Sequence, residues 1–182
     1  FPHLYKDGEV IPEEGFDTKD YNDVPLLLVS GTSEFSLFTA FDKRFAAAVS
    51  DGSLFKDENL LKEFTYAETY GSQLYRLSNT VESARIMTEH YTSPIYISQI
   101  SFGDDGTSAP TVAGLLGAFH GVFEPLLQTP SNYATFIGED FESAGAKELS
   151  KDFKAYLKQF VTTGDPNGDD LPKWEAWTAS NQ

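Results

Sequence analysis

Residues 24–35 read VPLLLVSGTSEF, and this stretch decides how the rest of the chain is interpreted. Its apolar run is continuous rather than alternating, which is typical of a strand buried on both faces of a parallel sheet. A buried turn of helix is the competing interpretation, but Pro25 at the start and Gly31 at the end favour a strand. An acid, Glu34, follows shortly after the end of this run.

A second stretch, PIYISQISF at residues 94–102, is rich in β-branched and aromatic residues and predicts a second strand. The sequence between Glu34 and Glu89 is helical in texture, with Asn79 or Thr80 as a candidate N-cap for a helix over residues 81–87. Strands separated by a long helical segment predict an α/β fold, with parallel strands flanked by helices. Two strands do not make a self-covering sheet, so we expect the chain to be part of a larger fold.

The clearest helix is predicted over residues 146–162. Spacings of four, three and four place one apolar set on a single face: Leu149, Phe153, Tyr156 and Phe160. Lysines repeat the spacing on the opposite face, which predicts a solvated surface: Lys147, Lys151, Lys154 and Lys158. The string GDPNG at residues 164–168 ends the helix, and we expect Trp174 and Trp177 to dock the tail onto the body.

Composition sets the outer limits on function. With 182 residues the chain suits a single domain, residues 1–182, and its net charge of −15 makes nucleic acid and anionic membrane surfaces unsuitable partners. The absence of cysteine excludes disulfides, thiolate metal sites and a cysteine nucleophile. No apolar run is long enough to span a bilayer. Because the chain begins with Phe1 rather than Met, we expect a processed or shortened product.

Two polar residues stand in loops that follow predicted strands. Glu34 lies in the acid loop near residues 31–36, and His120 lies in the small-residue loop GAFHG at residues 117–121. The carboxyl ends of strands are where open α/β sheets present catalytic groups. Each residue also has a plainer interpretation, because Glu34 suits the first turn of a helix and His120 could be a structural histidine. On spacing alone, the structural interpretation of His120 is favoured.

An acid followed by a histidine is the chain order of the α/β-hydrolase triad, in which the serine comes first. Only 33 residues precede Glu34, and none of them forms a Gly-x-Ser-x-Gly elbow. Ser143, in the string FESAGA at residues 141–146, has Phe in place of the first glycine, no preceding strand and the wrong order, so we predict a helix-start residue there. The string DPNGDD at residues 165–170 lacks the calcium-loop pattern and predicts a turn.

These features together resemble the C-terminal third of the type-B carboxylesterases, the cholinesterase-like branch of the α/β-hydrolases. The resemblance runs along nearly all of the chain, and five strings carry it in order: DGEVIP (7–12), DVPLLLVSG (23–31), EFSLF (34–38, with Phe where glycine is usual), GAFHG (117–121, followed by Pro125) and FVTTGDPN (160–167). The last of these is the most specific.

The resemblance implies a serine ester hydrolase in which Glu34 and His120 are the acid and histidine of a Ser-His-Glu triad. It implies that the serine lies in an N-terminal α/β-hydrolase portion, from the same precursor or a second chain, and that the isolated chain is inactive. It also implies a small ester as substrate and no cofactor or metal. With the acidic composition, it favours a secreted protein. A non-catalytic cholinesterase-like binding or adhesion module, or an inactive fragment, is the alternative.

Overall fold

The sheet of the computed structural model, which describes residues 5–14, 19, 22–102, 112–128, 132–133, 141–178 and 180, contains two parallel strands. Strand β1 (Leu26–Gly31) pairs with β2 (Ile95–Ile100), with Leu26 opposite Ile95 and Gly31 opposite Ile100. Both predicted strands and their parallel orientation are therefore confirmed. The result is a mixed α/β architecture with a small sheet.

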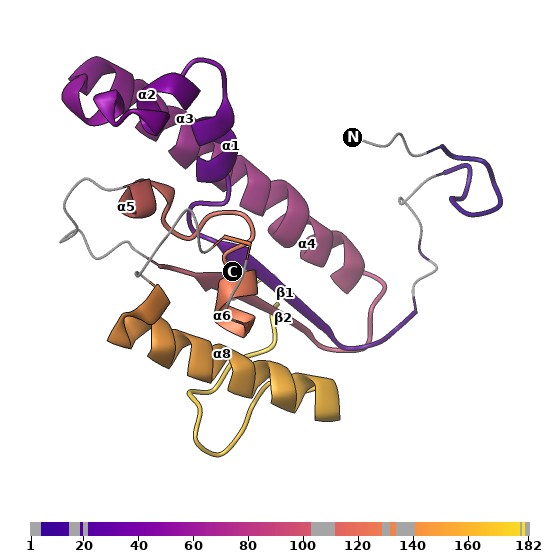
Figure 1. Cartoon of the computed structure of the whole chain (residues 1–182). Coiled ribbons are helices and arrows are strands. Elements are labelled where there is room, and N and C mark those ends of the chain that lie inside the picture. The colour runs from indigo at the N-terminus through magenta and orange to yellow at the C-terminus, as the bar shows by residue number, and fades with distance from the viewer. Residues whose placement is uncertain are drawn as a thin grey trace.

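The chain between the strands is helical, as predicted. It forms α1 (Ser36–Phe41), α2 (Ala46–Ser50), the short 3-10 helix η1 (Ser53–Lys56), α3 (Glu58–Arg76), the π turn η2 (Leu77–Val81) and α4 (Glu82–Thr88). The side chain of Asp57 caps α3 by accepting hydrogen bonds from the backbone N–H groups of Asn59 and Leu60. Figure 1 shows that α3 and α4 run together along one face of the sheet.

The predicted cap at Asn79 or Thr80 is wrong, because α3, η2 and α4 form one continuous helical run through these residues. A π turn inserts an extra residue and breaks the regular backbone pairing of a helix. Here the side chains of Ser78 and Asn79 compensate: Ser78 Oγ donates to the carbonyl of Leu74, and Asn79 Nδ2 donates to the carbonyl of Tyr75. Asn79 thus stabilises a helical irregularity rather than a helix start.

The second face of the sheet is covered by α8 (Ala144–Thr163), against which α6 (Phe123–Leu127) packs (Figure 1). Successive side chains of β2 point to opposite faces of the sheet. Ile95 clusters with Ala84 of α4 on one face, and the ring of Tyr96 contacts Phe160 of α8 on the other. The remaining helix of the described residues, α5 (Val112–Leu116), precedes the loop that carries His120.

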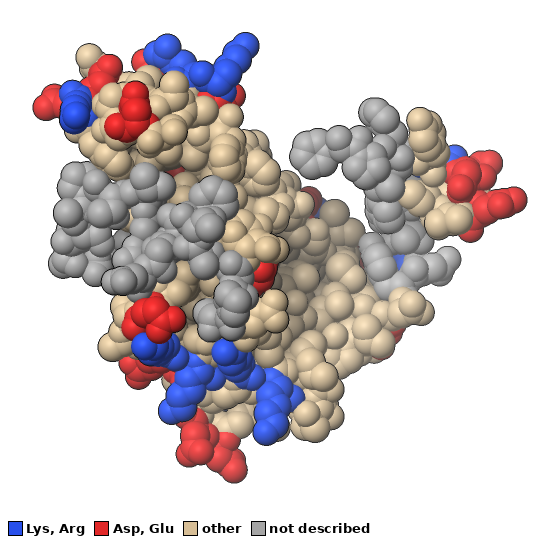
Figure 2. All heavy atoms as spheres, in the orientation of Figure 1, with Lys and Arg blue, Asp and Glu red and all other residues tan. Residues whose placement is uncertain are grey.

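Helix α8 matches its prediction closely. Phe153 is buried in the main core, the other three residues of its predicted apolar face are half-buried, and the four lysines of the opposite face are exposed. Figure 2 shows Lys and Arg side chains gathered over this helix. The left-handed Gly164, with φ of 79°, ends the helix, as the sequence predicts.

The C-terminal tail lies along the outer edge of β2. Trp174 Nε1 donates to the carbonyl of Ile97 at 2.9 Å, and the backbone N–H of Trp177 donates to the carbonyl of Ile95 at 2.7 Å. The prediction that both tryptophans dock the tail is confirmed. These bonds satisfy carbonyls that point away from β1, so the tail covers this part of the β2 edge through one backbone and one side-chain donor.

None of the described helices combines the length and the apolar character required to cross a membrane.

Candidate active site

The acid loop begins where β1 ends. Glu34 folds back onto the strand, and its Oε1 accepts a hydrogen bond of 2.5 Å from the backbone N–H of Gly31. The residue is only 2% exposed. It does not cap α1, whose N-cap position is Phe35 without a side-chain hydrogen bond, and it does not lie in the first turn of that helix. The plain helix-terminus interpretation of Glu34 is therefore excluded.

The histidine loop is fixed by its neighbours in the chain. Ala118, Phe119 and Val122 are completely buried, while His120 between them is exposed. The backbone N–H of Val122 donates to the carbonyl of Phe119 at 3.0 Å, which closes a turn around His120. Gly121 adopts a φ of 101°, a conformation that favours glycine. This arrangement anchors the backbone on both sides of the imidazole and leaves the ring at the surface.

Backbone contacts join the two loops. The N–H of Ser33 donates to the carbonyl of Ala118 at 3.1 Å, and the fully buried hydroxyl of Ser36 donates to the carbonyl of Leu116 at 2.6 Å. Gly31 approaches so closely that a Cβ added there would lie 2.0 Å from the carbonyl oxygen of Ala118. The relative position of the loops is thus set by main-chain packing and not only by the side chains that meet between them.

Glu34 and His120, which are separated by 86 positions in the sequence, meet directly. Nδ1 of His120 lies 2.9 Å from Oε2 of Glu34. The carboxylate is buried, whereas 48% of the imidazole side chain is exposed. Since an ionised carboxylate only accepts hydrogen bonds, Nδ1 donates, and Nε2 of the neutral ring is left with a free lone pair. The pair can therefore take up a proton at Nε2 while Glu34 stabilises the charge on the ring.

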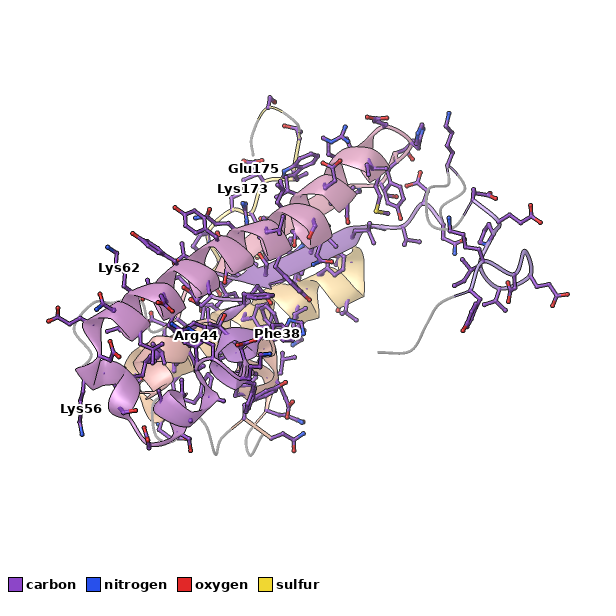
Figure 3. All side chains as sticks on the ribbon, turned by 90° about the horizontal axis from the view of Figure 1, so that it is seen from above. Phe38, Arg44, Lys56, Lys62, Lys173 and Glu175 are labelled. Carbon is purple, nitrogen blue, oxygen red and sulfur yellow. The ribbon has the colours of Figure 1, made fainter. Side chains whose placement is uncertain are left out.

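Two aromatic rings flank the imidazole. Phe38 of α1 and Tyr75 of α3 each lie 5.5 Å from it, centroid to centroid, with Tyr75 edge-on. Figure 3 shows Phe38 on α1 beside the long helix. Burial, and secondarily the negative charge of Glu34, raises the pKa of Tyr75 above its ordinary value, so the phenol is neutral beside the pair. Among the described residues, no serine forms a hydrogen bond with His120.

The serine and the acidic turn that the sequence analysis considered have structural roles, as a helix cap and a turn. Ser143 is the N-cap of α8, and its Oγ accepts a hydrogen bond from the N–H of Ala146 at 3.2 Å, which confirms the helix-start prediction. Asp165 accepts hydrogen bonds from Asn167, which lower its pKa and stabilise the predicted turn. No group of three or more potential metal ligands occurs in the described part of the chain.

Sequence reasoning missed Tyr75. It lies in the middle of a long helical stretch with no motif around it, and only the folding of α3 over the acid loop brings its ring to His120. Phe38 belongs to the string EFSLF that begins with Glu34, so the sequence indicated that it lies near the acid. Its contact with the imidazole could not be predicted from that string.

Comparison with known proteins adds no identification. No protein-family model matches this chain, and no curated protein matches it at a significant level.

Proposed function

We propose that this chain supplies the acid and the histidine of a serine ester hydrolase of the carboxylesterase type, within an α/β-hydrolase fold. The observation that carries the proposal is the hydrogen bond of 2.9 Å between a buried Glu34 and a half-exposed His120. Glu34 comes shortly after the carboxyl end of β1, and its contact with His120 brings the histidine to the same end of the sheet. This is where α/β sheets present catalytic groups. A buried acid that holds Nδ1 of a half-exposed histidine is the arrangement of the acid and histidine members of a triad.

The chemistry assigned to these residues is acyl transfer. Nε2 of His120 takes the proton of a serine hydroxyl as the serine oxygen bonds to the ester carbonyl carbon, and Glu34 stabilises the imidazolium that forms. Nε2 then gives this proton to the departing alkoxide as its bond to the carbonyl carbon breaks. In the second half, Nε2 accepts a proton from water, whose oxygen attacks the acyl-enzyme, and returns a proton to the serine.

The proposal places the serine in a further α/β-hydrolase portion, from the same precursor or a second chain. The edge of β1 that faces away from β2 is unpaired in the described part of the chain and suits such a partner. Backbone N–H and C=O groups alternate in direction along a strand, so those of Leu27 and Val29 point away from β2. No hydrogen bond to the backbone of either residue joins this edge to another described residue. The side chains of Leu26 to Val29 are only partly buried by the described residues, so further chain could cover the faces of this strand as well.

Fluorophosphonate labelling with intact mass and peptide mapping tests the proposal. The 182-residue chain alone should take no label, whereas a sample containing the complementary portion should be labelled on a serine of that portion. In the combined sample, His120→Ala should abolish labelling. His90→Ala, at an exposed histidine after α4, is the matched control and should label normally. A label on Ser143, or undiminished labelling of H120A, would contradict the assignment.

A non-catalytic binding module is the second candidate, favoured by an apolar stripe on the outer face of the long helix. Its members are all more than half exposed: Tyr66, Tyr70, Leu74 and Leu77. Large exposed apolar patches mark interaction surfaces. A complete protein that contains Glu34, His120 and an upstream serine elbow but takes no fluorophosphonate would favour this candidate.

A further inference from the structure

The imidazole of His120 has few direct constraints of its own. Glu34 is its hydrogen-bonding partner among the described residues, and about half of the side chain is exposed. A half-exposed side chain keeps rotamer freedom unless its neighbours remove it. The reaction proposed above needs a narrow range of ring orientations, because Nδ1 must face Glu34 while Nε2 faces the reacting groups. Something besides the hydrogen bond must restrict the ring.

The rings of Phe38 and Tyr75 are placed to do this. Each lies 5.5 Å from the imidazole, and they lie 6.4 Å from each other, so the three rings form one cluster. Phe35 supports Phe38 from the acid loop at 5.4 Å. The edge-on contact of Tyr75 with the imidazole, at this distance, is a favoured geometry for aromatic rings.

Tyr75 is held in place by the acid loop itself. One turn before it, the hydroxyl of Ser72 accepts a hydrogen bond of 2.9 Å from the backbone N–H of Phe35. Gly71 lies so close to Phe35 that an added Cβ would be 2.3 Å from its ring. The π turn η2 begins two residues after Tyr75, and Asn79 ties its side chain to the Tyr75 carbonyl. The ring that borders His120 is therefore fixed relative to the loop that presents Glu34.

We propose that Tyr75 is a positioning residue for His120, acting through its ring: with Phe38, it confines the imidazole to the orientation in which Nδ1 meets Glu34. This proposal rests on the proposed function only where it assumes that Nε2 transfers protons; the orientation of the ring does not depend on it. The ring rather than the hydroxyl is assigned because no hydrogen bond joins the phenol to either member of the pair, whereas the edge-on ring contact is direct.

Nitrogen-15 NMR of the imidazole in this chain tests the inference without requiring catalysis. In the wild type we expect one dominant neutral form, with the proton on Nδ1, and side-chain couplings of a single χ1 rotamer. Tyr75→Met keeps a long, helix-favouring side chain without a ring. It should lower the ratio of the Nδ1–H to the Nε2–H form about three- to tenfold, the range expected for losing one aromatic contact. Tyr75→Phe should match the wild type.

Matched variants separate positioning from general packing. Tyr70→Met changes an exposed tyrosine of the same helix and should leave the imidazole spectrum unchanged. Thermal unfolding of each variant verifies that it is folded, and Tyr75→Leu replaces Y75M if that variant is not. An unchanged ratio in Y75M, the same loss in Y75F, or averaged couplings in the wild type would overturn the inference. Failure of the proposed function is a separate outcome, because it appears as absent fluorophosphonate labelling.

Discussion

The main chain at Gly31 touches the main chain at Ala118, at a distance that leaves no room for a side chain. This contact lies at the end of β1 and joins the strand that leads to Glu34 with the loop that holds His120. A distance between two loops that is set by backbone contact is less adjustable than one set by flexible side chains.

Gly31→Ala is expected to destabilise the chain by about 1–3 kcal/mol, because the new Cβ forces the acid loop and the histidine loop apart. Chemical unfolding monitored by circular dichroism measures this cost. Gly168→Ala is the control, since nothing lies within 4 Å of a Cβ at that position, and it should change stability by less than about 0.5 kcal/mol. Equal stability of G31A and G168A would contradict the contact.

Glu34→Gln is expected to lower kcat on an activated ester by roughly 10²- to 10⁴-fold in a sample that includes the serine-bearing portion, with little change in KM. The amide lacks the charge that stabilises the imidazolium, and it can direct an N–H group at Nδ1. Glu63→Gln is the matched control, because Glu63 pairs with Arg44 at the surface of α3. Surface pairs contribute little, so E63Q should retain activity. A loss below tenfold in E34Q would remove Glu34 from the proposed triad.

Asp23 should make stability depend on pH in the acid range. It accepts hydrogen bonds from the side chain of Thr92 and the backbone of Thr92 and Ser93, and these lower its pKa from 3.8 to about 2. Because the folded pKa lies below the unfolded one, this contribution is complete above pH 3.8 and is lost as the pH falls towards about 2. The bonds join the chain before β1 to the chain before β2.

Asp23→Ala should therefore lower the urea midpoint at neutral pH, and its difference from the wild type should shrink progressively below pH 3.8. Asp169→Ala, at an exposed position in the turn that follows Pro166, is the control and should leave the urea midpoint at neutral pH close to that of the wild type. A difference for D23A that stays constant down to pH 2 would contradict the assigned hydrogen bonding.

Ser143→Ala is expected to cost about 1 kcal/mol of stability, since it removes the N-cap of α8, without affecting fluorophosphonate labelling of the combined sample. Gly145→Ala tests the same helix start, but here the expected change in stability is an increase. A Cβ there meets open space, so the substitution should stabilise the chain by up to about 1 kcal/mol. Lost labelling in S143A would reopen the assignment of this serine.

Much of the local structure could be predicted because it depends on neighbours in sequence. Continuous apolar runs located both strands, and the spacing of apolar residues and lysines located α8. Glu34 and His120 were identifiable as site candidates from their loops after predicted strands, their order in the chain and the resemblance of the strings around them, and the structure brings them within 2.9 Å. Their roles in catalysis stay predictions.

The remainder depends on contacts between distant segments. No sequence signal distinguished Tyr75 from other helix residues, since its place beside His120 follows from the packing of α3 on the acid loop. Asn79 has the chemistry of a helix cap, but the continuous run from α3 to α4 uses it to satisfy a carbonyl within a π turn. The tryptophans indicated a docked tail, whereas the edge of β2 that receives it could be known only from the fold.

The two edges of the sheet differ, because the described part of the C-terminal tail binds the edge of β2 and not that of β1. On one side, the carbonyls of Ile95 and Ile97 are occupied by the tail, while on the other side Leu27 and Val29 direct their backbone groups outward. Among the described residues nothing pairs with that edge of β1, and an unpaired edge strand is a template for association with other copies. The serine-bearing portion proposed above, by pairing with this edge, would limit such association as well as complete the proposed site. We expect the chain prepared alone to self-associate through β1, and to remain dispersed when that portion is supplied.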